Sequence, residues 1–175
     1  MYPEVQPSYD LRLKLVPEYL TVLNVGIGKI IPSLLARQLP LLPFKRLDHL
    51  ECYEPYIDLA KTFEWACKDV RYILGNAEEF TGYADYDLVL LFDVLEHMKK
   101  EEGIRILERC PHALVFGPVD TMISEAHEEN PEGDPHARHI SLWEPADFGI
   151  GWEVEVLKDF HDFGWRKMDA LWAMK

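Results

Sequence analysis

TVLNVGIGKII, residues 21–31, is the stretch that decides the fold class of this chain. It begins with an apolar, β-branched run of strand length and continues into two glycines, Gly26 and Gly28. The residues from Ile30 to Leu39 have helical spacing, so the pattern predicts a strand, a tight turn and a helix. Glycine permits positive φ and lets a ligand approach the backbone, while a helix start offers unpaired N–H groups. The turn is therefore predicted to hold a polar ligand, although G-x-G turns also occur for structural reasons.

Strands and helices alternate along the rest of the chain. Further strands are predicted over residues 47–53, 70–74, 86–92 and 113–116, and helices over 56–67 and 99–110. Two alternating segments, 152–157 and 168–174, suit an antiparallel pair. This order predicts an α/β fold with a doubly wound, mostly parallel, seven-stranded sheet and an antiparallel C-terminal strand pair. We expect a single domain over residues 1–175, with an arm or lid at 1–19 and a lid loop at 118–142.

Charge and hydropathy narrow the classes of partner. The 31 acidic and 18 basic residues give a formal charge of −13, and the basic residues are scattered along the chain. Such a surface repels phosphate backbones and anionic lipid, which disfavours nucleic acid and membranes as partners. No apolar run approaches the roughly 18 residues that span a bilayer, and residues 1–10 lack the features of a signal peptide. We therefore expect a cytoplasmic protein, with nucleic acid disfavoured but not excluded as a substrate, and we leave a homodimer open.

Polar residues follow the predicted strands. Glu54 and Pro55 follow the second strand, Asn76 and Ala77 come just after the third, and Asp93 directly follows the fourth. The carboxyl ends of parallel strands meet at one edge of a doubly wound sheet, where its ligands bind. These residues and the glycine turn are therefore predicted to form one binding site.

The order of these motifs resembles that of the class I S-adenosylmethionine-dependent methyltransferases. The resemblance covers roughly residues 21–116 and rests on the Asn-Val-Gly-Ile-Gly turn, Glu54-Pro55, the Gly-Asn-Ala-Glu run at 75–78, and YDLVLLFDVLEHM at 86–98. It is most similar to the small-molecule enzymes whose fourth motif reads D-V-x-x-L-E-H. The resemblance implies S-adenosylmethionine as cofactor and methyl transfer to an oxygen or nitrogen atom of a small-molecule acceptor.

The resemblance also implies a cofactor-binding role for a set of residues at the strand ends: Asn24, Gly26, Gly28, Glu54, Pro55, Asn76, Ala77, Phe92 and Asp93. Glu54 would accept hydrogen bonds from both ribose hydroxyls, because a carboxylate has two acceptor oxygens and no donor. Asn76 would accept a hydrogen bond from the adenine amine. Phe92 and Asp93 would border the sulfonium, since a ring face and a carboxylate both favour positive charge.

Two positions depart from the family pattern. Asn24 stands where an acid is usual, and Ile30 replaces the usual third glycine. An amide lacks the charge that would attract the ammonium group of the cofactor. These departures leave open a non-catalytic module of the same fold that binds S-adenosylmethionine or its demethylated product. A nicotinamide-dependent oxidoreductase is disfavoured, because the third glycine of its G-x-G-x-x-G motif would fall on Ile31.

The segment after the fourth strand carries the candidate catalytic residues. Asp93, Glu96 and His97 stand at i, i+3 and i+4, which places them on one face if the segment is helical. In one interpretation Glu96 and His97 are catalytic, and His97 acts as a general base on an acceptor hydroxyl or amine. In the other they bind a divalent metal, with His139 or His136 completing the set. The first interpretation, without a metal, is our prediction from the sequence.

Overall fold

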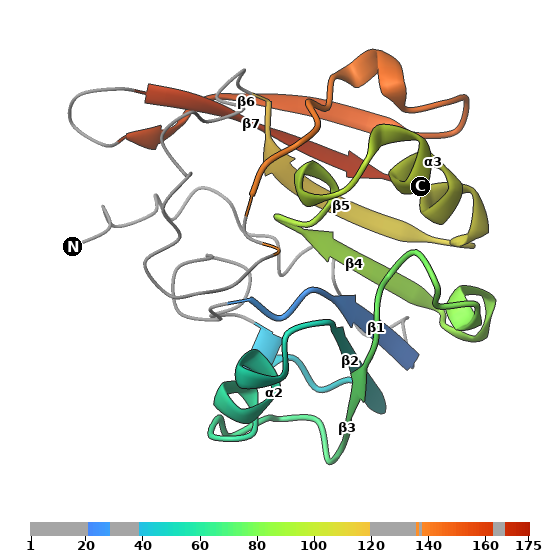
Figure 1. Cartoon of the computed structure of the whole chain (residues 1–175), viewed down its shortest axis with the longest axis vertical. Helices are drawn as coiled ribbons and strands as arrows, with labels where there is room; N and C mark the ends of the chain where they lie inside the picture. The colour runs from blue at the N-terminus through green and yellow to red at the C-terminus, as the bar shows by residue number, and fades with distance from the viewer. Residues whose placement is uncertain (1–20, 29–38, 120–135, 137, 163–166) are drawn as a thin grey trace.

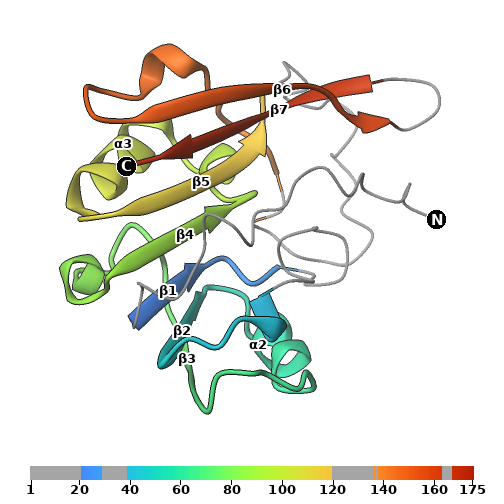
Figure 2. The same cartoon turned by 180° about the vertical axis from the view of Figure 1, so that it is seen from behind.

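Seven strands form one sheet in the order β3-β2-β1-β4-β5-β7-β6, and Figures 1 and 2 show its two faces. The computed structural model describes residues 21–28, 39–119, 136, 138–162 and 167–175. The strands are β1 (Thr21–Val25), β2 (Arg46–Glu51), β3 (Asp69–Leu74), β4 (Leu88–Phe92), β5 (Ala113–Pro118), β6 (Glu153–Asp162) and β7 (Lys167–Met174). β1 to β5 pair in parallel, whereas β7 is antiparallel to both β5 and β6. The predicted fold class is confirmed.

Helices cover the sheet. The α-helices are α2 (Glu54–Ala60) and α3 (Lys100–Arg109), and short 3-10 turns are η2 (Leu39–Leu41), η3 (Gly82–Asp85), η4 (Leu95–His97) and η6 (Pro145–Asp147). The predicted arm at 1–19, residues 30–38 of the predicted helix, and residues 120–135 and 137 of the predicted lid loop lie outside the described residues.

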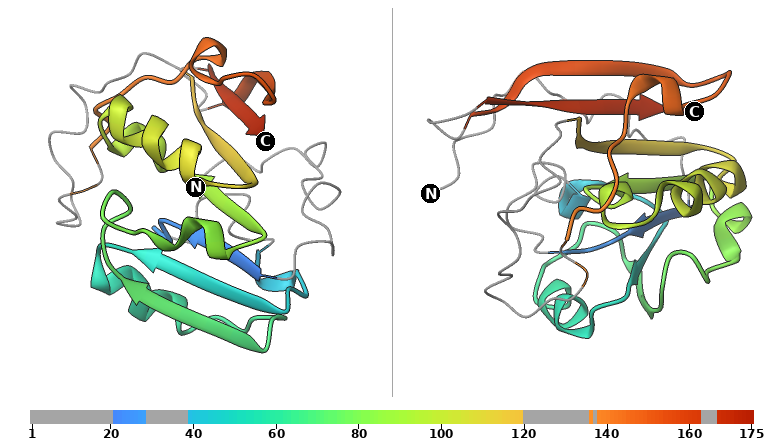
Figure 3. Two further views of the ribbon diagram at one scale, coloured as in Figure 1. Left: turned by 90° about the vertical axis from the view of Figure 1, so that its right-hand side faces the viewer. Right: turned by 45° about the horizontal axis from the view of Figure 1, so that its top comes forward.

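The central strands are buried on both faces, as their nearly continuous apolar sequences require. All five residues of β4 are buried. On one face α3 contributes Ile106 and Leu107 to a core that includes Val89 and Leu91 (Figure 3). On the other face α2 lies beside β2 and β3, where the Tyr72 hydroxyl donates to the carbonyl of Ala60 at 3.3 Å. The sheet therefore has helices on both sides.

Strand register determines where the strands end. Val25 of β1 lies opposite Leu50 of β2 and Leu91 of β4, and Glu51 lies opposite Leu74 of β3. Because these strands are parallel and in step, the residues that follow each of them emerge at the same edge. We call this edge, where β1 to β5 end, the carboxyl edge.

The second strand and the helix after it differ from the prediction. β2 ends at Glu51, two residues before the predicted end, and α2 begins at Glu54 and ends at Ala60. Pro55 lies in the first turn of α2, where its missing N–H and fixed φ are favourable, and the Glu54 carboxylate there complements the helix dipole. Glu54 therefore stands at a helix start, and its predicted place at a strand end is wrong.

Gly26 is predicted to be required for stability. Its φ is +70°, and a Cβ there would lie 2.6 Å from Cγ2 of Val94. We expect Gly26→Ala to lower the free energy of unfolding by roughly 2–4 kcal/mol, from left-handed strain and overpacking together. Urea unfolding measures this change, with Gly149→Ala as control, because no described atom lies within 4 Å of a Cβ at Gly149. Equal stability of the two variants would contradict the assignment.

Candidate functional site

The glycine turn opens the site at the end of β1. Gly26 and Gly28 both have positive φ, and the N–H of Gly26 donates to the carbonyl of Leu50 at 2.8 Å, which fixes the turn to β2. A Cβ at Gly28 would meet no described atom within 4 Å. As far as the described residues go, the backbone at Gly28 is open on the side where a side chain would otherwise stand.

Glu51 ends β2 and faces the glycine turn. Its Oε2 accepts hydrogen bonds from the N–H of Ile27 at 2.7 Å and of Gly28 at 3.0 Å, and its Oε1 accepts one from the N–H of Tyr53 at 2.9 Å. Glu51 is only 5% exposed, and these charge-assisted bonds compensate the burial of its carboxylate. Glu54, in contrast, is exposed on α2. The carboxylate at this strand end is thus that of Glu51, which the sequence reasoning missed.

Asn24 is buried within the sheet. It pairs with His49 in the register of β1 and β2, and its Nδ2 lies 3.2 Å from Nδ1 of His49. The His49 ring is fully buried, with ring centroids 4.6 Å from Trp65 and 5.5 Å from Tyr72. This burial lowers the pKa of His49 to about 4. The side chain of Asn24 is therefore used in a core hydrogen bond.

Asn76 and Ala77 follow β3 at the same edge. The N–H of Gly75 donates to the carbonyl of Glu51 at 2.9 Å, which ties this turn to the end of β2. The carbonyl of Ala77 accepts a hydrogen bond from the Tyr83 hydroxyl at 2.7 Å, and Asn76 is exposed. These contacts bring both predicted adenine-binding residues to the strand end that carries Glu51.

Phe92 and Asp93 lie where β4 ends. The Phe92 ring is buried and stacks on Trp172 with centroids 6.4 Å apart. Asp93 has a φ of +51°, a left-handed conformation that aspartate tolerates better than most residues, and its N–H donates to the carbonyl of Phe116 at 2.8 Å. Burial, together with the nearby Glu96 carboxylate, raises the pKa of Asp93 to about 8.

The last residues of the predicted lid loop, and Trp143 after it, are bonded to η4. The carbonyl of Glu96 accepts hydrogen bonds from the N–H of Ile140 at 2.7 Å and of Ser141 at 3.1 Å, and the Trp143 indole donates to the carbonyl of Leu95 at 3.0 Å. A Cβ at Gly103 of α3 would lie 2.5 Å from the Trp143 ring, so the indole occupies the space left by this glycine. Residues 138–143 are thereby fixed against η4.

This arrangement brings His139 to Glu96 and His97. The rings of His97 and His139 meet edge to face with centroids 4.7 Å apart. One potential ligand atom from each of the three residues lies within 4.8 Å of the others. His136, the alternative partner predicted from the sequence, is exposed and does not belong to this cluster.

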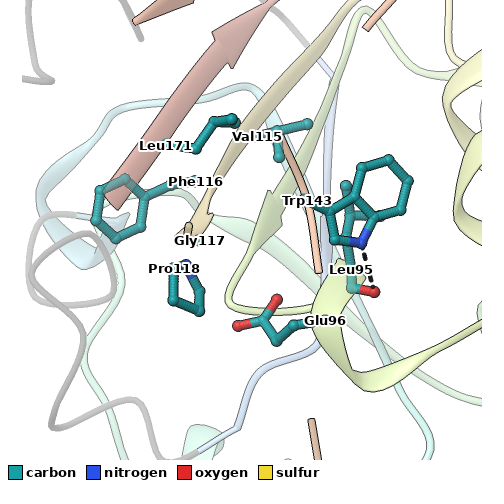
Figure 4. Close-up of a pocket in the computed structure, with 8 residues that line it drawn as sticks. All are labelled: Leu95, Glu96, Val115, Phe116, Gly117, Pro118, Trp143 and Leu171. Carbon is teal, nitrogen blue, oxygen red and sulfur yellow. Dashed lines mark hydrogen bonds between the residues drawn. The ribbon is translucent and has the colours of Figure 1, made fainter. Parts of the chain in front are cut away.

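Glu96 borders a small cavity at the end of β5 (Figure 4). Figure 4 shows its carboxylate directed toward Gly117 and Pro118 and away from Trp143. Glu96 is 4% exposed, and its Oε1 has no hydrogen-bond partner among the described residues. Burial raises its pKa to about 8. The cavity is lined by Leu95, Glu96, Val115, Phe116, Gly117, Pro118, Trp143 and Leu171.

The fold is shared with solved methyltransferase structures. A structure from Methanosarcina mazei described as a SAM-dependent methyltransferase matches with a TM-score of 0.63 and 10% identity, over 95% of this chain and 96% of that one. The N-methyltransferase NodS of Bradyrhizobium japonicum matches with a TM-score of 0.60 and 13% identity, over 89% and 84% of the two chains. Magnesium protoporphyrin IX methyltransferase of Synechocystis, solved with bound SAH, matches with a TM-score of 0.58 and 15% identity, over 96% and 79%.

The comparisons with family models and with curated sequences gave no match. No protein-family model matches the chain, and no curated protein sequence matches it. Among the described residues, none of the helices has the length and apolar character needed to cross a membrane.

The burial of His49 predicts that part of the free energy of unfolding is lost at acidic pH. Its pKa is about 4 in the folded state and 6.5 when unperturbed, so between these values the unfolded chain binds the proton first. The stability present above pH 6.5 is therefore lost as the pH falls toward 4, by about 1.4 kcal/mol per pH unit. Urea unfolding at pH 7 and 4.5 should show the wild type losing about 2 kcal/mol more than His49→Gln. Parallel losses in the two proteins would contradict this explanation.

Proposed function

We propose that this chain is an S-adenosylmethionine-dependent methyltransferase that transfers a methyl group to an oxygen or nitrogen atom of a small-molecule acceptor. The observation that carries the proposal is the convergence of an open glycine turn, the Glu51 carboxylate and the Asp93–His97 segment on one carboxyl edge. Ligands of doubly wound sheets bind at this edge. The fold shared with methyltransferases, one of them solved with SAH, supports the choice of cofactor.

The β1 to β3 side of the edge suits the adenosyl group. The Glu51 carboxylate has about four acceptor sites, and it accepts hydrogen bonds from three backbone N–H groups and, at 3.6 Å, from the Cys52 thiol. Because a thiol is a weak donor, a ribose hydroxyl would take its place. We assign to Glu51 the ribose-binding role predicted for Glu54, because Glu54 is exposed on α2. Asn76 and Ala77 keep their predicted role beside the adenine.

The β4 side of the edge suits the reacting groups. S-adenosylmethionine, when bound, supplies a methyl group on a positively charged sulfur. Gly26 would leave room for its methionine part, and the Asp93 carboxylate, once ionised, would favour the positive charge. Methyl transfer then requires mainly that the acceptor is aligned with the methyl group and that water is excluded.

His97 and Glu96 are proposed to serve the acceptor. Nδ1 of His97 lies 3.2 Å from the carbonyl oxygen of Arg138, which can only accept, so Nδ1 carries the proton in this bond. The lone pair of the neutral ring is then on Nε2. In this tautomer Nε2 can take a proton from an acceptor hydroxyl or amine, while Glu96 lines the same side.

A binding module without transferase activity is the second candidate. Asn24 favours it, because its amide is bonded to His49 in the core and no carboxylate stands at this position. The ammonium group of the cofactor would then lack one ionic partner. The net charge keeps a small-molecule acceptor ahead of nucleic acid. A cytoplasmic location and a homodimer remain predictions from the sequence.

Calorimetry with S-adenosylmethionine and S-adenosylhomocysteine tests the cofactor site. We expect Glu51→Gln to weaken binding about 10- to 100-fold, as is typical for losing hydrogen bonds to a charged group. Glu54→Gln is the matched control and should bind within about twofold of the wild type, because a solvated carboxylate contributes little. Because Glu51 also supports the glycine turn, the thermal unfolding of both variants is compared first, which separates a loss of cofactor binding from a loss of folding. Weakening by Glu54→Gln alone would return the ribose role to Glu54.

Turnover distinguishes the enzyme from the binding module. We expect the wild type to transfer an isotopically labelled methyl group to a component of a small-metabolite pool. His97→Gln should lower that rate about 10²- to 10⁴-fold while S-adenosylmethionine affinity stays unchanged, because the loss is of proton transfer. Cofactor binding by the wild type without transfer to any pool would favour the module.

A further inference from the structure

We propose that Glu96, His97 and His139 form a site for one divalent first-row transition metal ion. Their potential ligand atoms lie within 4.8 Å of one another. Metal–nitrogen and metal–oxygen bonds are about 2.1 Å long, so ligand atoms at adjacent positions on one ion are about 3.0 to 3.4 Å apart. The widest of the three separations must therefore close by about 1.5 Å, which rotation of the side chains would supply.

The buried state of Glu96 points to a missing cation. Its carboxyl group is almost fully buried, and Oε1 has no hydrogen-bond partner in the described part of the chain. Nor does any described lysine or arginine form an ion pair with Glu96. A buried carboxylate is costly unless it is paired, so the unpartnered group keeps its proton, and a bound metal ion would take the place of that proton.

His97 has the orientation of a metal ligand. Its Nδ1 is held by the carbonyl oxygen of Arg138 at 3.2 Å, which leaves the lone pair of the neutral ring on Nε2. Histidines that bind metals almost always donate their other ring N–H to a carbonyl or carboxylate in this way, which fixes tautomer and ring direction.

The backbone places His139 before any ion binds. The next two residues, Ile140 and Ser141, donate their N–H groups to the carbonyl of Glu96. The ligands therefore come from two segments that are hydrogen-bonded to each other at the site itself. Such a preformed arrangement reduces the conformational entropy lost on binding.

The donor set selects the kind of metal. Two imidazoles and one carboxylate suit Mn²⁺, Fe²⁺, Co²⁺ or Zn²⁺, whereas Ca²⁺ and Mg²⁺ prefer oxygen ligands throughout. Three protein ligands leave further coordination positions open, as in catalytic metal sites. The small cavity beside Glu96 lies next to this cluster.

The site also narrows the acceptor class, a step that rests on the proposed function. An ion with two open positions favours an acceptor that offers two neighbouring oxygen atoms, such as a vicinal diol. With the ion bound, Nε2 of His97 would be a ligand instead of the general base, and the hydroxyl to be methylated would release its proton to solvent, because metal coordination lowers its pKa. Oxygen is then preferred over nitrogen as the methylated atom.

Calorimetric titration of the metal-free, tag-free full chain with Co²⁺ and Mn²⁺, without cofactor, tests the site. We expect one ion per chain, and at least tenfold weaker binding in Glu96→Gln, His97→Ala and His139→Ala. His136→Ala is the matched control, because His136 comes from the same stretch but lies outside the cluster, and it should bind like the wild type. Circular dichroism confirms that each variant is folded.

Two results overturn the proposal: a wild type that binds neither ion, or His139→Ala and His136→Ala binding equally well. Because the titration contains no cofactor, its result is independent of methyl transfer. Metal binding without S-adenosylmethionine binding would support the site and reject the proposed function. Cofactor binding without metal binding would do the reverse. For the acceptor class, turnover on vicinal diols that survives complete metal removal overturns the inferred role of the ion.

Discussion

The contact between the Glu51 carboxylate and the backbone of the glycine turn organises the carboxyl edge. A single buried side chain at the end of β2 binds the N–H groups of Ile27 and Gly28 and that of Tyr53, so the turn after β1 and the chain entering α2 share one anchor. Through its backbone carbonyl, Glu51 also receives the N–H of Gly75 after β3. The relative positions of the first three strand ends therefore depend on one residue.

The two sides of the carboxyl edge differ in how far hydrogen bonds compensate their carboxyl groups. Around Glu51 the negative charge is compensated by three backbone donors. Around Asp93 and Glu96 burial is only partly compensated, and the pKa values of both carboxyl groups rise to about 8. A buried glutamate without a partner for one of its oxygens, next to a half-buried aspartate and two histidines, is typical of a site that binds a cation or a substrate.

The sequence predicted the fold better than the site. Strand periodicity and the G-x-G turn are local signals, so the strand count, the mostly parallel order and the antiparallel end pair were all predictable. The end of β2 was not, because Leu50 to Tyr53 reads as a continuous strand and Glu-Pro reads as its stop. In the structure β2 ends at Glu51, whose side chain binds the glycine turn, a tertiary contact without a local pattern. A charged residue inside an apolar run was the available signal.

The histidine cluster shows the same limit. Spacing predicted that Glu96 and His97 act together, but the choice between His136 and His139 depends on hydrogen bonds from Ile140 and Ser141 to η4 that no spacing encodes. The Asn24 side chain was likewise predicted to face the cofactor. Its hydrogen bond to His49 was not predictable, because it depends on the register of two strands. Whether either residue set binds a ligand is a separate question from where the fold places it.

The fit between Gly103 and the Trp143 ring links a surface helix to this cluster. Because the indole lies where a Cβ would be, any larger residue at position 103 would displace Trp143 and, through the chain it anchors, His139. The choice of amino acid in α3 thus has a remote effect on the chemistry available at the sheet edge. Substitution at this helical position would therefore shift the histidine cluster without changing any of its three side chains.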